Sequence, residues 1–155
     1  MTEQTDHADV KIHPPVLTLI HIGIAYAAKW LIPIPFAVPN ILRTIGLPLA
    51  AIGFLLAVSA LLEFRKAHTT VDPHGSVKSI VTSGIYRFTR NPIYAGFLLV
   101  LIGIPLNSGT YWGLLLAPVF IVSINNLVIQ HEEAYLEKKF GDVYAGYKSR
   151  VRRWI

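Results

Sequence analysis

The chain has 155 residues, a formal charge of +5 at pH 7 and a mean hydropathy of +0.49, with 53% hydrophobic and only 15% charged residues. Soluble domains of this size carry about 25% charged residues, so water is not the main solvent of this chain. Its basic residues lie between and after apolar runs, not on a polar, aromatic-studded surface, which excludes nucleic acid as a partner. The absence of cysteine excludes disulfide frameworks, thiolate metal sites and cysteine nucleophiles.

The chain opens with a polar, acidic segment, residues 1–15, and no small-residue cleavage site follows the first apolar run, so we expect no cleaved signal peptide. A membrane-spanning helix needs about 20 mostly apolar residues. Four stretches approach that length: 16–32, 44–62, 93–106 and 111–129. We therefore predict an all-α fold, a polytopic transmembrane bundle of about four spans that forms a single domain over residues 1–155.

The third apolar stretch is short for a span. It becomes adequate only if its helix starts at Asn91 or Pro92 and is either tilted or continued past Pro105. The connections at residues 33–36 and 107–110 contain helix breakers and no charge, which is typical of tight turns on one side of a membrane.

The distribution of basic residues predicts the orientation. Eleven of the fourteen lie in residues 63–92 or in the tail after residue 129, whereas only Lys29 and Arg43 lie at the opposite span ends. Because Lys and Arg are retained on the cytoplasmic side, we predict an even number of spans with both termini in the cytoplasm. The tail carries apolar side chains at helical spacing and predicts a cytoplasmic amphipathic helix or helix pair, which Gly141 interrupts.

The densest cluster of candidate site residues, 83–94, ends a polar loop and opens the third apolar helix. Asn91 followed by Pro92 is a good helix start, since Asn can cap free backbone N–H groups and Pro at the first position needs no donor. With Arg87 and Arg90 beside it, this helix N-terminus forms a candidate site for a carboxylate or phosphate. The alternatives are capping alone for Asn91 and contact with lipid headgroups for the arginines.

A second cluster follows the fourth apolar stretch. Glu132 and Glu133 lie where the hydrocarbon ends, and a carboxylate left in lipid is costly, so at least one needs a partner or a wet pocket. Arg87 or Arg90 is the expected partner. The alternative is a solvated first turn of the tail helix, where acids favour the helix dipole.

Other polar residues suggest structural roles. Asn125 and Asn126, like His21 and Ser59, fall inside apolar stretches, where we expect hydrogen bonds to neighbouring helices or a place on a cavity wall. His68, His74 and His131 lack the compact pairing with acids that metal sites need, so we predict no metal.

The two clusters together resemble the isoprenylcysteine carboxyl methyltransferase and phospholipid methyltransferase superfamily of integral membrane methyltransferases. The resemblance covers roughly residues 69–155, and its motif-bearing catalytic region is 84–155. The first two spans add only hydrophobicity to it. The residues that carry it are 84–94 and then Glu132, Glu133, Leu136, Phe140, Gly141, Tyr144, Tyr147 and Val151.

This resemblance implies a helical membrane enzyme that binds S-adenosylmethionine in a pocket of the last spans and the tail, with a lipidic acceptor entering from the bilayer. Arg90 and Glu133 would be catalytic. The implied cofactor-binding residues are Tyr86, Arg90, Asn91, Pro92, Tyr94, Glu132 and Glu133. The family often has His where this chain has Asn91, which cannot become cationic.

We hypothesise that Arg90 and the helix N-terminus bind the methionine carboxylate. Glu132 or Glu133 would bind the ribose hydroxyls or the amino group, and Tyr94 or Tyr86 would pack against adenine.

The resemblance leaves the acceptor and two other functions open. An isoprenylcysteine-like carboxylate would need a cation such as Arg150 or Arg153 for orientation, whereas a phospholipid amine would need a base. One alternative is an NADPH-dependent membrane sterol or enone reductase, whose C-terminal region is similar. The other is a non-enzymatic membrane scaffold whose basic surface holds anionic lipid. The sequence does not specify the oligomeric state.

Overall fold

The computed structural model describes residues 7–72 and 75–154, so His74 and the first six residues of the polar N-terminal segment lie outside the described residues. Within the described ranges every regular element is helical, which confirms the all-α prediction. The elements are α1 (Pro14–Leu31), α2 (Asn40–Lys66), the 3₁₀ turn η1 (Gly84–Arg87), α3 (Pro92–Asn107), α4 (Trp112–Ile124), the π-helical turn η2 (Asn125–Ile129), α5 (Gln130–Phe140) and α6 (Asp142–Arg150).

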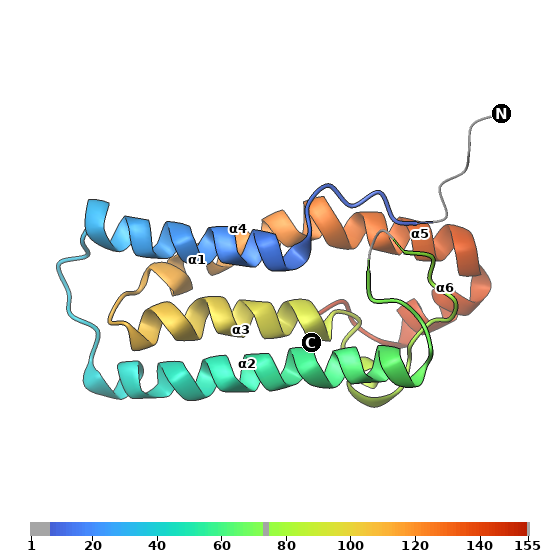
Figure 1. Ribbon diagram of the computed structural model, residues 1–155, viewed down its shortest axis with the longest axis horizontal. Helices are drawn as coiled ribbons and strands as arrows, with labels where there is room; N and C mark the ends of the chain where they lie inside the picture. The colour runs from blue at the N-terminus through green and yellow to red at the C-terminus, as the bar shows by residue number, and fades with distance from the viewer. Residues whose placement is uncertain (1–6, 73–74, 155) are drawn as a thin grey trace.

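The four long helices lie side by side in two layers, with α1 next to α4 and α2 next to α3 (Figure 1). Helix α3 contacts α1, α2 and α4, so it is the central helix. It starts at Pro92 and continues past Pro105 to Asn107, as the span-length argument required. Leu101 of α3 and Phe120 and Ile124 of α4 form the fully buried core.

Helices α2 and α3 approach each other through glycines. A Cβ added at Gly96 would lie 2.4 Å from the carbonyl oxygen of Gly53, and one at Gly103 would lie 2.4 Å from that of Gly46. Small residues allow such close backbone packing in membranes, where lipid tails offer helices no hydrophobic drive to associate. Helix α2 therefore contributes specific close packing to the bundle as well as hydrophobicity.

Among the described residues, two helices are long and apolar enough to cross a bilayer: α2 and the continuous 29-residue helix Trp112–Phe140, which comprises α4, η2 and α5. Helix α3 is a shorter apolar helix. Large apolar side chains of α1 and α2 are exposed, among them Leu19, Trp30, Leu47, Phe54 and Leu55. This surface suits lipid rather than water, as expected of a membrane protein.

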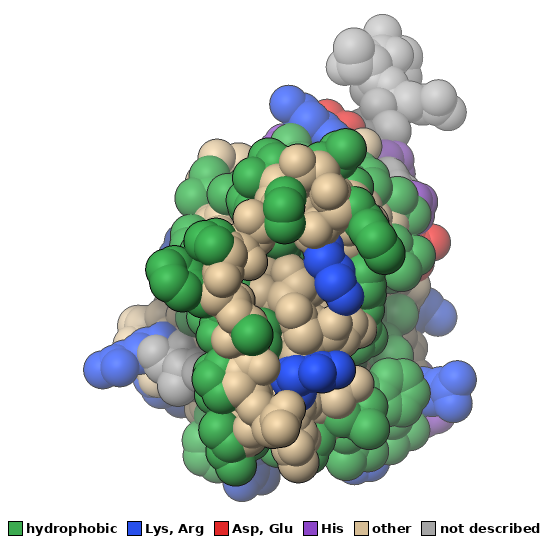
Figure 2. Space-filling view, turned by 90° about the vertical axis from the view of Figure 1, so that its left-hand side faces the viewer, with side chains coloured by type: hydrophobic (Ala, Val, Ile, Leu, Met, Phe, Trp, Pro, Cys, Tyr) green, Lys and Arg blue, Asp and Glu red, His purple; other side chains and the backbone are tan. Residues whose placement is uncertain are grey.

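One end of the bundle carries the α1–α2 and α3–α4 connections. Figure 2 shows that this end face is largely hydrophobic around an area of backbone and uncharged polar side chains, with basic side chains near its middle. Lys29 donates a 2.8 Å hydrogen bond to the Ser108 carbonyl, and the Tyr26 hydroxyl lies 2.6 Å from the Ser108 hydroxyl. These contacts tie α1 to the α3–α4 turn. The candidate site lies at the opposite end, where α5, α6 and the long loop after α2 meet (Figure 1).

Three of the polar side chains within the apolar helices bond to their own helix. The His21 ring lies 2.8 Å from the Leu17 carbonyl oxygen, Ser59 donates to Leu56, and Asn126 accepts from Gln130. Ser and His side chains reach carbonyls one turn back, so these residues need no neighbouring helix. The predicted interhelical hydrogen bonds are wrong for all three.

Candidate active site

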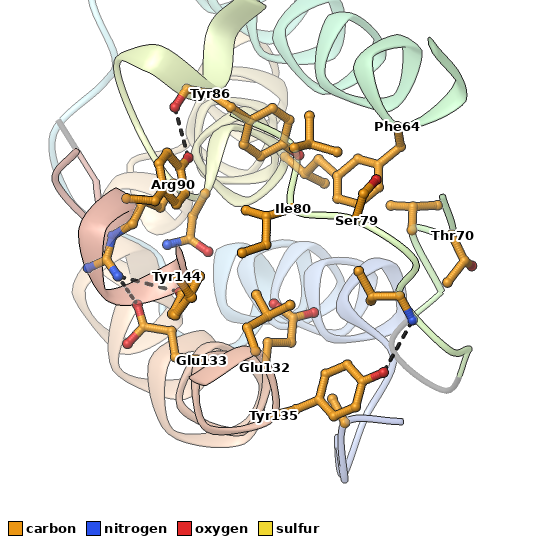
Figure 3. Close-up of a pocket in the computed structure, with 18 of the residues that line it drawn as sticks. Phe64, Thr70, Ser79, Ile80, Tyr86, Arg90, Glu132, Glu133, Tyr135 and Tyr144 are labelled. Carbon is orange, nitrogen blue, oxygen red and sulfur yellow. Dashed lines mark hydrogen bonds and ion pairs between the residues drawn. The ribbon is translucent and has the colours of Figure 1, made fainter. Parts of the chain in front are cut away.

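A pocket of about 120 Å³ lies at the polar end of the bundle. Its walls come from the end of α2, loop residues 70–72 and 77–81, η1, the start of α3, and α5 and α6. Figure 3 shows Arg90, Glu133 and Tyr144 on one side and Phe64, Thr70 and Ser79 on the other. Six of the seven predicted cofactor residues line it: Tyr86, Arg90, Asn91, Tyr94, Glu132 and Glu133. The seventh, Pro92, is fully buried at the first position of α3.

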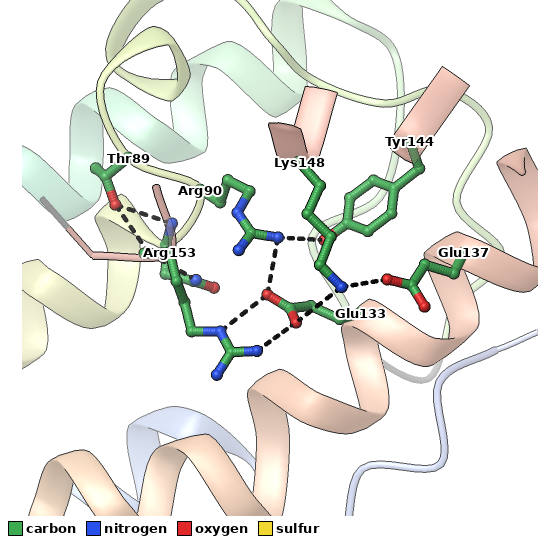
Figure 4. Close-up of polar contacts among 8 residues, drawn as sticks. Thr89, Arg90, Glu133, Glu137, Tyr144, Lys148 and Arg153 are labelled. Carbon is green, nitrogen blue, oxygen red and sulfur yellow. Dashed lines mark hydrogen bonds and ion pairs between the residues drawn. The ribbon is translucent and has the colours of Figure 1, made fainter. Parts of the chain in front are cut away.

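Glu133 is the centre of the polar wall (Figure 4). Arg153 binds its carboxylate through two hydrogen bonds, Nε to Oε1 at 3.1 Å and Nη2 to Oε2 at 2.6 Å. Arg90 Nη1 lies 3.0 Å from Oε1, and the side chains of Arg90 and Glu133 are each only 9% exposed. The predicted pairing of the acids with Arg87 or Arg90 is thus confirmed for Glu133 and Arg90, whereas the pairing with Arg153 was missed.

The segment 151–154, called here the C-terminal strap, brings Arg153 to this position. Its backbone binds the start of α3: Arg90 N–H donates to the Arg152 carbonyl, and Thr89 Oγ1 and Asn91 Nδ2 donate to the Arg153 carbonyl, at 3.0, 3.2 and 2.9 Å. Trp154 packs against the main core. The expected capping role of Asn91 is wrong, because its amide binds the strap and makes no cap hydrogen bond to α3.

Glu132 has a different partner from Glu133. The Tyr94 hydroxyl donates a 2.6 Å hydrogen bond to its Oε1 atom, which joins α3 to α5. Arg87 is exposed and does not line the pocket, and Arg150 Nε donates to the Gly146 carbonyl within α6. The charged groups at the pocket wall are therefore Arg90, two glutamates and Asp72.

Glu63, at the end of α2, was missed by the sequence analysis. It is 9% exposed, accepts hydrogen bonds from Ser83 and Lys66 at 2.5 and 2.6 Å, and lies against Gly84, whose φ is +56°. A Cβ at Gly84 would lie 2.6 Å from Glu63 Cδ. Glu63 thus fixes the start of η1, which carries Tyr86. A lone acid at the end of an apolar stretch was the available signal.

The other wall of the pocket is apolar and was not predicted either. The loop after α2 supplies Val71, Val77, Ile80 and Val81, and Phe64 packs edge-on against the Tyr86 ring with centroids 5.5 Å apart. Tyr147 of α6 donates a 2.8 Å hydrogen bond to the Tyr86 carbonyl. Burial raises the pKa of the Tyr86 and Tyr147 hydroxyls, so both stay neutral at physiological pH.

Arg90 also has an unused donor. Its Nε atom is buried and has no hydrogen-bond partner among the described residues, although buried polar groups are nearly always paired. A free guanidinium N–H, two carboxylates and an apolar wall together suit a ligand with an anionic group, a cationic group and a flat hydrophobic part. No cluster of three potential metal ligands occurs in the described ranges.

Comparison with known proteins gives related matches. A family model described as phospholipid methyltransferase matches residues 41–143. An uncharacterized protein of Haemophilus influenzae is 44% identical over 63 residues, which is 41% of this chain and 100% of that protein. Protein-S-isoprenylcysteine O-methyltransferase of Schizosaccharomyces pombe is 29% identical over 72% of this chain and 48% of its own length. Protein-S-isoprenylcysteine O-methyltransferase B of Arabidopsis thaliana is 27% identical over 68% of this chain and 55% of its own length. No solved structure matches.

The chain spans about half the length of these two named methyltransferases. The family match starts at residue 41, so it includes α2, which the resemblance drawn from the two clusters left out. The matches favour methyl transfer and give no support to the reductase or scaffold alternatives. Since the family model covers more than half of the chain, this protein belongs to the phospholipid methyltransferase family.

Proposed function

We propose that the chain is an S-adenosylmethionine-dependent methyltransferase that acts on a membrane-embedded lipidic acceptor. One observation carries the proposal: two motifs about forty residues apart in sequence line the same pocket, where Arg90, which is paired with Glu133, keeps one donor without a partner among the described residues. The names of the S. pombe and A. thaliana relatives support the same class of reaction.

The pocket residues fit the cofactor. The free Nε of Arg90, with the N-terminus of α3, would bind the methionine carboxylate. Glu133 already has two arginine partners, so Glu132 is the better candidate for the amino group or the ribose hydroxyls. Tyr86, Tyr94 and the apolar wall would flank adenine, while Asn91 and Pro92 hold the helix start in place.

Methyl transfer requires little from the protein beyond positioning the cofactor and the acceptor. When bound, S-adenosylmethionine supplies an electrophilic methyl group on a sulfonium, and the carbon–sulfur bond breaks as the bond to the acceptor forms. The pocket residues hold the reactants in line and exclude water, so no covalent nucleophile is needed. Arg90 would act at the cofactor, and Glu133 would keep the Arg90 guanidinium in place.

The acceptor is proposed as a lipid or a lipidated molecule that enters from the bilayer. An isoprenylcysteine-like carboxylate follows from the names of the two relatives, and a phospholipid amine follows from the name of the family. A screen of both classes with radiolabelled methyl donor would separate them, because the products differ in partitioning and in stability to base.

The proposed topology has four spans, with the site and both termini in the cytoplasm. The chain contains no cysteine, so labelling of a single introduced cysteine shows directly on which side of the membrane that residue lies. Asp142→Cys at the site end should resist a membrane-impermeant maleimide in intact cells, and Phe36→Cys, which is 75% exposed at the other end, should react. The reverse pattern would exclude this orientation.

Calorimetric titration of detergent-purified protein with S-adenosylmethionine and with NADPH tests the proposed reaction class. Saturable binding of S-adenosylmethionine alone is expected, weakened in Arg90→Lys and Glu133→Gln, because Lys cannot make the planar two-pronged contact of a guanidinium. Binding of NADPH alone, or of neither nucleotide by folded protein, would exclude the proposal.

A further inference from the structure

Glu133 shares one carboxylate between two arginines in unequal ways. Arg153 holds both oxygens, whereas Arg90 reaches only Oε1, through Nη1. Lys148 is a third cation near Glu133, with its Nζ 4.0 Å from Oε2, and it pairs more closely with Glu137. Arg153 therefore occupies the two-pronged position on the carboxylate, and its hydrogen bonds to Glu133 raise the pKa of its own guanidinium.

This division leaves Arg90 with an incomplete set of contacts. Its Nη1 atom contacts Glu133 and, at 3.5 Å, the Tyr144 hydroxyl, while its buried Nε has no partner in the described part of the chain. Bidentate pairing is the favoured geometry of a guanidinium with a carboxylate. If the carboxylate were not already occupied by Arg153, Arg90 would be free to make that pair with its own Nε.

The placement of Arg153 depends on the C-terminal strap. Three hydrogen bonds hold the strap backbone to residues 89–91, so Arg153 is fixed to the same chain segment as Arg90. Its side chain is 35% exposed and does not line the pocket, so the guanidinium acts on the pocket through its ion-pair partner Glu133. Arg152 lies on the same strap with an exposed side chain.

We infer that Arg153 is a positioning residue of the cofactor site. By holding both oxygens of Glu133, it keeps the Nε of Arg90 available to the anionic group of the ligand. The inference rests on the proposed function and adds to it a residue outside the pocket that controls recognition of the amino-acid part of the cofactor.

The test compares two ligands that differ in that part. S-adenosylmethionine carries the carboxylate, and 5′-methylthioadenosine has the nucleoside and the sulfur but no amino acid. In Arg153→Met, which keeps the apolar stem, the Kd for S-adenosylmethionine should rise about tenfold or more, while the Kd for methylthioadenosine stays within about twofold. The Kd of Arg153→Lys for S-adenosylmethionine should lie between those of Arg153→Met and wild type, because Lys keeps the charge but cannot bind both carboxylate oxygens as a planar guanidinium does.

Two further variants separate this role from general damage. Arg152→Met, on the same strap, should bind both ligands within about twofold of wild type, since its side chain holds nothing in the network. In a Glu133→Gln background, Arg153→Met should raise the Kd for S-adenosylmethionine by less than about threefold more. The effects of two residues that act through one contact are not additive.

The outcomes are distinct. If wild type does not bind S-adenosylmethionine, the proposed function fails and the inference fails with it. If wild type binds and folded Arg153→Met keeps its affinity, only the inference is overturned. Equal losses for the two ligands, or losses that add fully with Glu133→Gln, also overturn it, since both indicate a merely structural effect. Where Arg153→Met does not fold, the same two-ligand comparison on Arg153→Lys decides.

Discussion

The hydroxyl of Tyr94 on α3 donates a 2.6 Å hydrogen bond to the carboxylate of Glu132 on α5, across 38 residues of sequence. Tyr94 is 8% exposed, so this bond links the first motif to the second at a largely dry place. Hydrogen bonds in such low-dielectric places are stronger than those at the surface. The bond therefore helps to hold the two walls of the pocket in register.

Loss of this bond should destabilise the protein. Tyr94→Phe leaves the Glu132 carboxylate without its hydroxyl partner, which should lower the free energy of unfolding by about 1–3 kcal/mol. Chemical unfolding in mixed micelles measures the change. Tyr111→Phe is the matched control, because its hydroxyl makes only a 3.4 Å contact at the other end of the bundle. Equal stabilities of the two variants would contradict the role given to Tyr94.

Contact between α2 and α3 should not tolerate a single added methyl group. In Gly96→Ala the new Cβ would lie 2.4 Å from the Gly53 carbonyl oxygen, so the helices must separate, at a cost of about 1–3 kcal/mol. Gly23→Ala in α1 meets nothing within 4 Å and should be neutral or slightly stabilising, since Ala is the better helix former. Thermal unfolding in detergent compares them, and similar melting temperatures would exclude tight packing at Gly96.

The start of η1 should be sensitive to a side chain for two reasons. Gly84 has φ of +56°, and a Cβ there would lie 2.6 Å from Glu63 Cδ. Gly141 has φ of +48° and ψ of −123°, outside the left-handed helical region, with open space around it, so Gly141→Ala carries only backbone strain, about 1–3 kcal/mol. Gly84→Ala should in addition shift Tyr86 and weaken S-adenosylmethionine binding in calorimetry. Unchanged S-adenosylmethionine binding by a folded Gly84→Ala variant would show that the contact between Glu63 and η1 does not influence the site.

Alkaline pH should destabilise the site end of the bundle. Burial, followed by the charge of Glu133, raises the pKa of Tyr144 to about 12, above the ordinary tyrosine value of about 10. A group whose pKa is higher in the folded state stabilises fully below its unfolded pKa and loses that contribution as pH rises toward the folded value. The melting temperature of wild type should therefore fall faster than that of Tyr144→Phe between about pH 10 and 12. Parallel curves would contradict a buried, neutral Tyr144.

Much of the helical plan is already contained in the sequence. Apolar runs separated by breakers predict α1 to α4 to within a few residues, because helix length and hydropathy are local properties. Pro92 starts α3, and Gly141, which has a positive φ, separates α5 from α6, since both effects depend on a single residue's backbone. The pairing of at least one of the two glutamates with Arg87 or Arg90 also followed, because a carboxylate at the hydrocarbon boundary needs a cation.

What only the tertiary structure decided is which distant groups meet. The sequence did not distinguish Glu132 from Glu133. In the packed bundle Glu132 accepts a hydrogen bond from Tyr94, whereas Glu133 pairs with two arginines. Three other contacts join segments that have no fixed spacing in the chain: Arg153 with Glu133, Asn91 with the strap, and Glu63 with the start of η1. Periodicity fixes which face of a helix is apolar, but only the packed bundle determines which side chain of another segment lies against a given polar group.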